Sequence, residues 1–155
     1  MIHRKYVMAV ALGGLLVNAG CGGSSTPSSP SAPAPTPVPV PVTTVVTTGQ
    51  SGINARGSGV VTDFSLASPG TVRATLRWTF ASSDVDVWVL SGTACNTQVN
   101  GVPTGAGCTI LCQDIGTSGT SATCSFAATA GTFRVWGTNY GSQNESGTFE
   151  VTVTR

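Results

Sequence analysis

The sequence predicts an all-β protein, an antiparallel, jelly-roll-like β-sandwich that follows a signal peptide and a disordered, proline-rich linker. Val, Thr, Ser and Gly dominate the chain after residue 42, and no stretch keeps a helical period over about 11 residues. Several segments alternate apolar and polar side chains, which gives each strand one dry and one wet face. Successive strands of this kind are typical of an antiparallel sandwich.

The chain begins with a pattern that indicates export. A basic region at residues 3–5 is followed by an almost wholly apolar run at residues 6–17, and then by Ala19, Gly20 and Cys21. This order resembles the bacterial lipoprotein signal, in which the cysteine is acylated and becomes the first residue of the mature chain. The apolar run is too short for a membrane span, because about 12 residues reach only about 18 Å of a core about 30 Å thick.

Lipid attachment at Cys21 is favoured over simple secretion. Asn18 stands where lipoprotein signals usually carry an aliphatic residue, so cleavage after Ala19 and release of a soluble protein is the alternative. The chain has five cysteines, however, and an exported protein seldom keeps an odd one free. By resemblance to enterobacterial lipoproteins, an Asp at position 22 would hold the protein at the inner membrane, and this chain has Gly22 instead. We therefore expect residues 1–20 to be the signal peptide and the outer membrane to be the location.

Residues 21–41 form the lipidated cysteine and a linker. From Gly22 onward the linker contains seven of the nine prolines and neither charge nor a large side chain, so it cannot bury enough apolar area to fold. The Pro-x-Pro spacing favours polyproline II at about 3.1 Å per residue. Twenty residues would span about 60 Å, and we expect a stalk that holds a domain away from the membrane.

Residues 42–155 are expected to form one domain with a single core. The clearest strands lie at residues 71–80, 84–90, 132–138 and 148–154, and weaker strands lie at residues 43–48, 60–66, 108–113 and 122–127. Turn signals separate them at residues 68–70, 130–131 and 140–142.

Alternation assigns a face to each side chain of the clear strands. In residues 71–80 it places Trp78 and Phe80 in the core and the two arginines outside. The predicted outward residues that could carry function are Arg73, Arg77, Asp84, Asp86, Trp88, Arg134 and Trp136.

The order of these segments resembles the bacterial pre-peptidase C-terminal domain. The matching pieces are residues 70–78, 84–89, 130–135 and 147–153, with an acidic-aliphatic repeat in the second and an Ala-Gly-Thr start in the third. The resemblance covers most of residues 60–154 and implies a small jelly-roll-like sandwich, often appended to secreted proteases. This chain differs by an insertion that carries four cysteines.

The four cysteines are Cys95, Cys108, Cys112 and Cys124, and an oxidising compartment predicts two disulfides. If the chain is extended between Cys108 and Cys112, their separation of about 13 Å prevents a bond between them. Two pairings remain: Cys95–Cys108 with Cys112–Cys124, or Cys95–Cys112 with Cys108–Cys124. The first is favoured because each bond closes a neighbouring loop. A zinc site is disfavoured by export and by the absence of histidine after the signal.

The residue inventory argues against an enzyme. His3 and Lys5 are the chain's only histidine and lysine, and both leave with the signal, which excludes Ser-His-Asp, Cys-His and Ser-Lys schemes. Asp84 and Asp86 lie on one strand about 7 Å apart, so they cannot flank a substrate as a glycosidase pair must. We therefore expect no catalytic residues.

Calcium is the one cofactor that the carboxylates suggest. Asp84 and Asp86 could hold Ca²⁺ with a third oxygen from Asn139, Asn144 or Glu145. The resemblance adds that some related collagen-binding modules bind calcium. The alternative is that both carboxylates are solvated or paired with arginine.

The outward tryptophans give the main functional prediction. Trp88 and Trp136 should lie on the wet face, and exposed aromatic side chains often mark surfaces that bind sugars or proteins. With Arg73, Arg77 and Arg134 they would form a flat binding platform. The alternative is Arg–Trp stacking, or cover by the linker or an inserted loop.

Charge limits the partners. After residue 21 the chain has five arginines and six acidic residues without a basic stretch, which argues against nucleic acid. The sequence thus predicts a non-catalytic, lipid-anchored binding module of the cell envelope that contacts glycan or protein. The alternative is a structural or assembly lipoprotein that packs on an envelope partner.

Overall fold

Ten β-strands and no helix make up the part of the chain that the computed structural model describes, residues 35–116 and 119–155. The predicted signal peptide, Cys21 and most of the predicted linker lie outside these residues. No helix among the described residues is long and apolar enough to cross a membrane. Residues 38–155 form one compact unit, and the following description concerns that unit.

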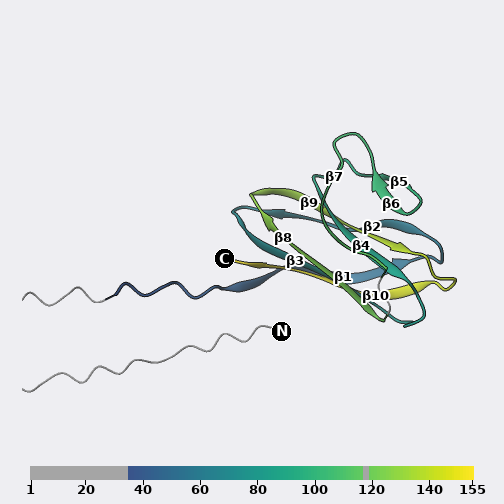
Figure 1. Cartoon of the computed structure of the whole chain (residues 1–155), viewed down its shortest axis with the longest axis horizontal. Coiled ribbons are helices and arrows are strands. Elements are labelled where there is room, and N and C mark those ends of the chain that lie inside the picture. Colours follow the sequence, from purple (N-terminus) through teal and green to yellow (C-terminus); the bar gives the residue numbers. More distant parts are fainter. Residues whose placement is uncertain (1–34, 117–118) are drawn as a thin grey trace, which may run out of the picture. The chain divides into compact units, whose positions relative to one another are not determined.

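The strands follow the chain in a regular order (Figure 1). They are β1 (Thr43–Ile53), β2 (Ser58–Leu66), β3 (Gly70–Trp78), β4 (Val85–Ser91), β5 (Thr97–Val99), β6 (Val102–Thr104), β7 (Thr109–Asp114), β8 (Ser121–Ala128), β9 (Gly131–Asn139) and β10 (Glu145–Thr154). All eight strands predicted from the sequence are present, and β5 and β6 are additional.

Two four-stranded antiparallel sheets pack face to face. Sheet A has the order β1-β10-β3-β8, sheet B has the order β2-β9-β4-β7, and β5 pairs only with β6. When the β5–β6 hairpin is set aside, the eight remaining strands read 1-8-3-6 in one sheet and 2-7-4-5 in the other. This is the strand order of a jelly roll, in which two Greek keys form a double sheet. The predicted all-β, jelly-roll-like sandwich is therefore confirmed.

The core lies between the sheets and contains the inward residues of each alternating strand. Val72, Ala74, Leu76 and Trp78 of β3 are all buried, as the alternation predicts. The prediction for Phe80 is wrong, because its side chain is 42% exposed. β3 ends at Trp78, and the backbone N–H groups of the next two residues turn to donate to Glu145 Oε2 instead of continuing the ladder.

A disulfide joins the two sheets at one edge. Cys112 lies on β7, at the edge of sheet B, and Cys124 lies on β8, at the edge of sheet A. Cys124 is buried opposite Ala74 and packs in the core. The second disulfide, Cys95–Cys108, closes the segment between β4 and β7. The favoured pairing of the four cysteines is confirmed.

The β5–β6 hairpin has a tight turn at Asn100-Gly101. Both residues have positive φ, 52° and 83°, as a two-residue type I′ turn requires. Asn-Gly between short strands is a strong local signal for such a hairpin, so the sequence contained the information for β5 and β6.

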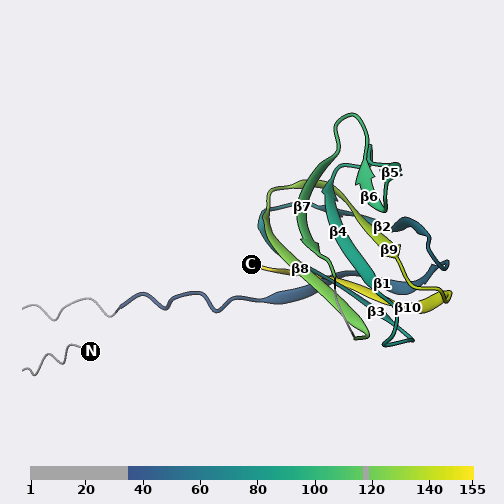
Figure 2. The same cartoon turned by 45° about the vertical axis from the view of Figure 1, so that its right-hand side comes forward.

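The ends of the sandwich are distinct. Val42 and Arg155 exchange backbone hydrogen bonds of 2.8 and 3.0 Å, so the chain enters β1 beside its C-terminal residue, as Figures 1 and 2 show. We call this the proximal end. β1 then runs about 35 Å to Ile53, opposite Glu145. The turns at residues 54–57, 79–84 and 140–144 form the other end, which we call the distal end.

Replacing Cys112 and Cys124 by serine should lower the free energy of unfolding by about 3 kcal/mol, because a bond across this loop restricts the unfolded chain. Urea unfolding without reductant measures the loss, and hydrogen exchange should rise in β7 and β8. The Cys95→Ser, Cys108→Ser variant is the matched control, since its loop is of similar length but lies outside the sandwich. A loss below about 1 kcal/mol, or exchange unchanged in β7 and β8, would contradict the role of this bond.

Candidate functional site

The two tryptophans of sheet B form a second, smaller apolar cluster. Trp88 on β4 and Trp136 on β9 are cross-strand neighbours, and both point to the outer face of the sheet. They are nevertheless buried, with exposed fractions of 2% and 4%, and they cluster with Leu90, Cys95 and Cys108. The prediction of an exposed aromatic face is therefore wrong. The alternative from the sequence, cover by an inserted loop, is what the structure has.

The covering segment is residues 92–108, between β4 and β7, which we call the cap. Outward side chains of β9, and the residue that follows β9, donate hydrogen bonds to backbone carbonyl groups of the cap. Arg134 Nη1 donates to Cys95 O at 2.8 Å, Thr138 Oγ1 donates to Gly101 O at 2.6 Å, and Tyr140 Oη donates to Asn100 O at 2.9 Å. Trp136 packs between these contacts. The cap is thus fixed along much of β9.

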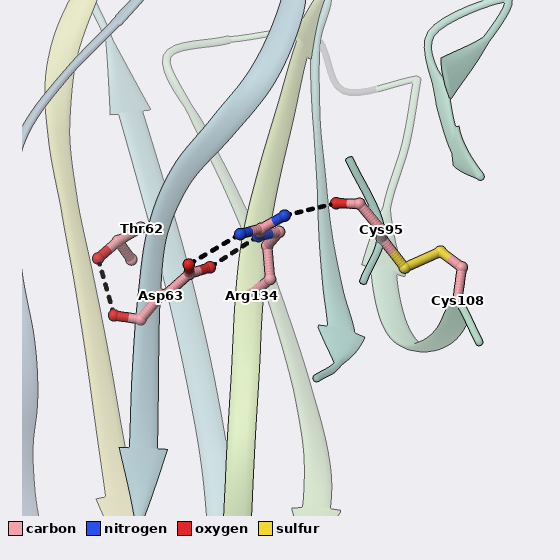
Figure 3. Close-up of polar contacts among 5 residues, drawn as sticks. All are labelled: Thr62, Asp63, Cys95, Cys108 and Arg134. Atoms are coloured by element: carbon pink, nitrogen blue, oxygen red, sulfur yellow. Dashed lines mark hydrogen bonds and ion pairs between the residues drawn. A yellow bond between two sulfur atoms is a disulfide. The ribbon is translucent and has the colours of Figure 1, made fainter. Parts of the chain in front are cut away.

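Arg134 links the cap to the sheet (Figure 3). Its Nε and Nη2 donate to the two carboxylate oxygens of Asp63, its cross-strand neighbour on β2, at 2.7 and 2.8 Å. The hydrogen bonds that Arg134 donates to Asp63 raise the pKa of Arg134, against an opposing effect of burial. The guanidinium is already engaged on two sides, so it is a structural residue of the cap.

The predicted platform of three arginines and two tryptophans is not assembled. Arg73 and Arg77 lie on β3, on the outer face of sheet A, whereas Trp88, Trp136 and Arg134 belong to sheet B. The two groups are therefore on opposite faces of the sandwich. Among the described residues, the side chains of Arg73 and Arg77 have no hydrogen-bond or ion-pair partner.

Asp84 and Asp86 lie in different environments. Asp84 is exposed, and its carbonyl group accepts a hydrogen bond from Tyr140 N. Asp86 is only 5% exposed, and its Oδ1 accepts from Gly116 N at 2.8 Å. Burial raises the pKa of Asp86, the bond from Gly116 lowers it, and the negative charges of Asp84 and Asp114 raise it further.

The predicted third ligands for calcium have other partners. Asn139 Oδ1 accepts from Gly141 N, Asn144 Oδ1 accepts from Ala55 N, and Glu145 Oε2 accepts from the backbone after β3. Within residues 35–116 and 119–155, no three His, Cys, Asp or Glu side chains gather in a way that could hold a metal ion. A calcium site at Asp84 and Asp86 stays a prediction from the sequence.

A polar cleft of about 510 Å³ lies where the cap meets the distal end of the sandwich. This volume is in the range of small-molecule sites. Its lining comes from the β1–β2 turn, the β5–β6 hairpin and the end of β9: Arg56, Gly57, Ser58, Gln98, Asn100, Gly101, Thr138, Asn139 and Tyr140. A smaller hollow of about 210 Å³ between β1 and β2 is lined by small or uncharged residues and offers no charged or aromatic group.

Backbone conformation distinguishes this cleft. Arg56 and Asn100 are the described non-glycine residues with positive φ, and both line it. The type I′ turn explains Asn100. Arg56, at φ 53°, is the third residue of the turn that Gly57 N closes onto Asn54 O at 2.9 Å, a position that favours glycine or asparagine. A left-handed conformation costs an arginine about 1 kcal/mol. The Arg56 N–H donates to Gly141 O at 3.0 Å, which joins two distal turns.

The cleft presents a mixed set of groups to a ligand. The side chain of Arg56 is exposed and has no hydrogen-bond or ion-pair partner among the described residues. Tyr140 is 43% exposed, so part of its ring faces solvent. The sequence reasoning identified neither residue. Only the tertiary fold brings the β1–β2 turn, the hairpin and the end of β9 together, although the Asn-Gly signal could have located the hairpin.

Comparisons with known proteins do not assign the chain to a family. No protein-family model matches the chain, and no curated protein matches it. Among solved structures, the chain is similar to the Yersinia pseudotuberculosis-derived mitogen (YPM), with 16% identity, coverage of 74% of this chain and 87% of that chain, and a TM-score of 0.41. The resemblance to the pre-peptidase C-terminal domain stays a prediction.

Replacing Arg134 by lysine should loosen the cap, because lysine cannot hold both Asp63 and Cys95 O in the same way. We expect a red shift of tryptophan emission and stronger acrylamide quenching, as Trp88 and Trp136 gain access to water. Arg73→Lys, on the outer face of sheet A, is the matched control. Identical emission and quenching in the two variants would show that Arg134 does not hold the cap.

Replacing Asp86 by asparagine should remove a pH-dependent loss of stability. Because the folded pKa is raised above the ordinary 3.8, the folded state binds the proton more tightly, and stability falls as pH rises from about 3.8 through the folded value. The stability of Asp86→Asn relative to wild type should therefore increase with pH across this interval. Urea unfolding between pH 3 and pH 7 tests this, with Glu150→Gln as the control. A difference that stays constant or shrinks would contradict it.

Proposed function

We propose that the protein is a non-catalytic binding module, anchored by lipid to the cell envelope, that binds a glycan in the cleft at its distal end. The observation that carries the proposal is Arg56. A glycine would adopt this backbone conformation without cost, whereas the arginine here places a guanidinium without a partner among the described residues at the cleft. Strained residues of this kind concentrate at ligand sites.

The position of the cleft supports display from a membrane. The predicted stalk would join the sandwich at Val42, beside Arg155, at the proximal end. The cleft lies at the other end, after the full length of β1. A lipid on Cys21 would therefore hold the protein by the end that is remote from the ligand. The two disulfides are in keeping with an oxidising, extracytoplasmic environment.

The lining favours a sugar over an apolar ligand. Hydroxyl groups and side-chain amides surround the partly exposed ring of Tyr140, and sugars combine apolar ring faces with many hydroxyl groups. The residues that line the cleft include no histidine, cysteine, lysine or carboxylate. The proposal is accordingly for binding without turnover.

Replacing Arg56 by glycine tests the proposal. The full chain, purified in detergent, would be applied to a glycan array, and we expect a ligand whose affinity falls about tenfold or more in Arg56→Gly. The variant should be as stable as wild type, or up to about 1 kcal/mol more stable, because glycine relieves the left-handed conformation. Loss of binding would then not result from unfolding.

Arg77→Ala is the matched control, since Arg77 is an exposed arginine of sheet A without a partner. Its affinity should equal that of wild type. A glycan that binds Arg56→Gly normally would place the site elsewhere. An empty array would favour the alternative from the sequence, a structural or assembly lipoprotein that packs on an envelope partner.

A further inference from the structure

We infer that the distal cleft selects an acidic sugar that carries a single carboxylate, and that Arg56 is the residue that determines this specificity. The inference rests on the proposed function and adds the chemical class of its ligand. It follows from three observations on the cleft: the charge of Arg56, the hydrogen bonds that the other polar lining groups already make, and the acidic residues near Tyr140.

Arg56 is the one charged side chain in the cleft lining. A guanidinium is planar and can hold both oxygens of a carboxylate through parallel hydrogen bonds. In the part of the chain that the structure describes, neither an acidic side chain nor a carbonyl group engages it, in contrast with Arg134. The guanidinium is therefore free to bind a carboxylate from outside the protein.

The remaining polar groups of the cleft supply both hydrogen-bond donors and acceptors. Gln98 Oε1 already accepts from Gly101 N, and Asn139 Oδ1 accepts from Gly141 N. The hydroxyl groups of Thr138 and Tyr140 donate into the cap, which leaves their oxygens as acceptors. Among the described residues, the Gln98 amide NH₂, the Asn100 side chain and the Ser58 hydroxyl have no hydrogen-bond partner. These donors and acceptors suit the hydroxyl groups of a sugar, and the guanidinium of Arg56 remains for its carboxylate.

Charges behind the Tyr140 wall limit the ligand to one acidic group. Burial raises the pKa of Tyr140, and the negative charges of Asp86 and Asp84 raise it further. The backbone places both carboxylate residues on this side of the cleft, because the Asp84 carbonyl group accepts from Tyr140 N and Asp86 is the cross-strand neighbour of Thr138. A second anionic group placed there would be repelled, whereas a sugar hydroxyl would not. This geometry disfavours sulfated polymers and other polyanions.

The test compares matched pairs of sugars on the full chain in detergent. Oligosaccharides that end in glucuronate are compared with their glucose counterparts, and N-acetylneuraminate-terminated glycans with the same glycans after removal of that residue. We expect the acidic member of one pair to bind at least about tenfold more tightly by titration calorimetry. This preference should disappear in Arg56→Gly, fall in Arg56→Lys and persist in Arg77→Ala.

Four other results are possible, and each overturns a different part of the inference. Equal affinity for both members of a pair that binds would overturn the carboxylate preference and leave the glycan-binding function in place. A preference that survives in Arg56→Gly would overturn the assignment to Arg56. Tighter binding of heparin than of every single-carboxylate sugar would overturn the limit to one charge. No binding of any member would overturn the proposed function, and the inference with it.

Discussion

Two tryptophans on the outer face of sheet B impose the constraint on which the rest of the structure depends. Burying a side chain of this size is worth about 4–6 kcal/mol at most, so leaving Trp88 and Trp136 in water would be costly. The cap at residues 92–108 covers them, and the outward row of β9 fixes its path. That path brings the Asn100-Gly101 turn to Tyr140, where it becomes a wall of the cleft. A packing requirement in the middle of the sheet thus determines the geometry of the candidate site at its end.

The close fit of this wall depends on Gly101. Its φ of 83° suits glycine, and a Cβ there would collide with the Tyr140 hydroxyl group and the Thr138 side chain. The two disulfides hold different parts of the domain. Cys112–Cys124 joins the edges of the two sheets, whereas Cys95–Cys108 closes the base of the cap beside the point where Arg134 holds it. The sandwich is therefore closed independently of the cap that it carries.

Much of the fold could be predicted from the sequence, because alternation with a period of two is a local property of each strand. It located eight strands and the inward residues of β3, and loop closure favoured the correct cysteine pairing. Alternation gives the direction of a side chain but not what covers it, so Trp88 and Trp136 were placed correctly on the outer face and wrongly in water. The prediction for Phe80 is wrong because β3 ends two residues earlier, at Trp78, where the backbone turns to donate to Glu145. Arg56 has no local signal, since its role depends on turns that meet only in the folded chain.

The entry of the chain at Val42 has a mechanical consequence. If the membrane anchor and a bound glycan pull against each other, tension would enter beside Arg155 and leave at Arg56, in the turn that follows β1. Most of the load would pass along the covalent backbone of β1. The part of the force that Tyr140 and the cap carry would reach β1 through the hydrogen bonds between β1 and β10. Because this force acts parallel to the strands, it would load these hydrogen bonds together in shear rather than break them one by one. The pulling force would therefore act along the strands, the direction in which a β-sandwich resists unfolding best.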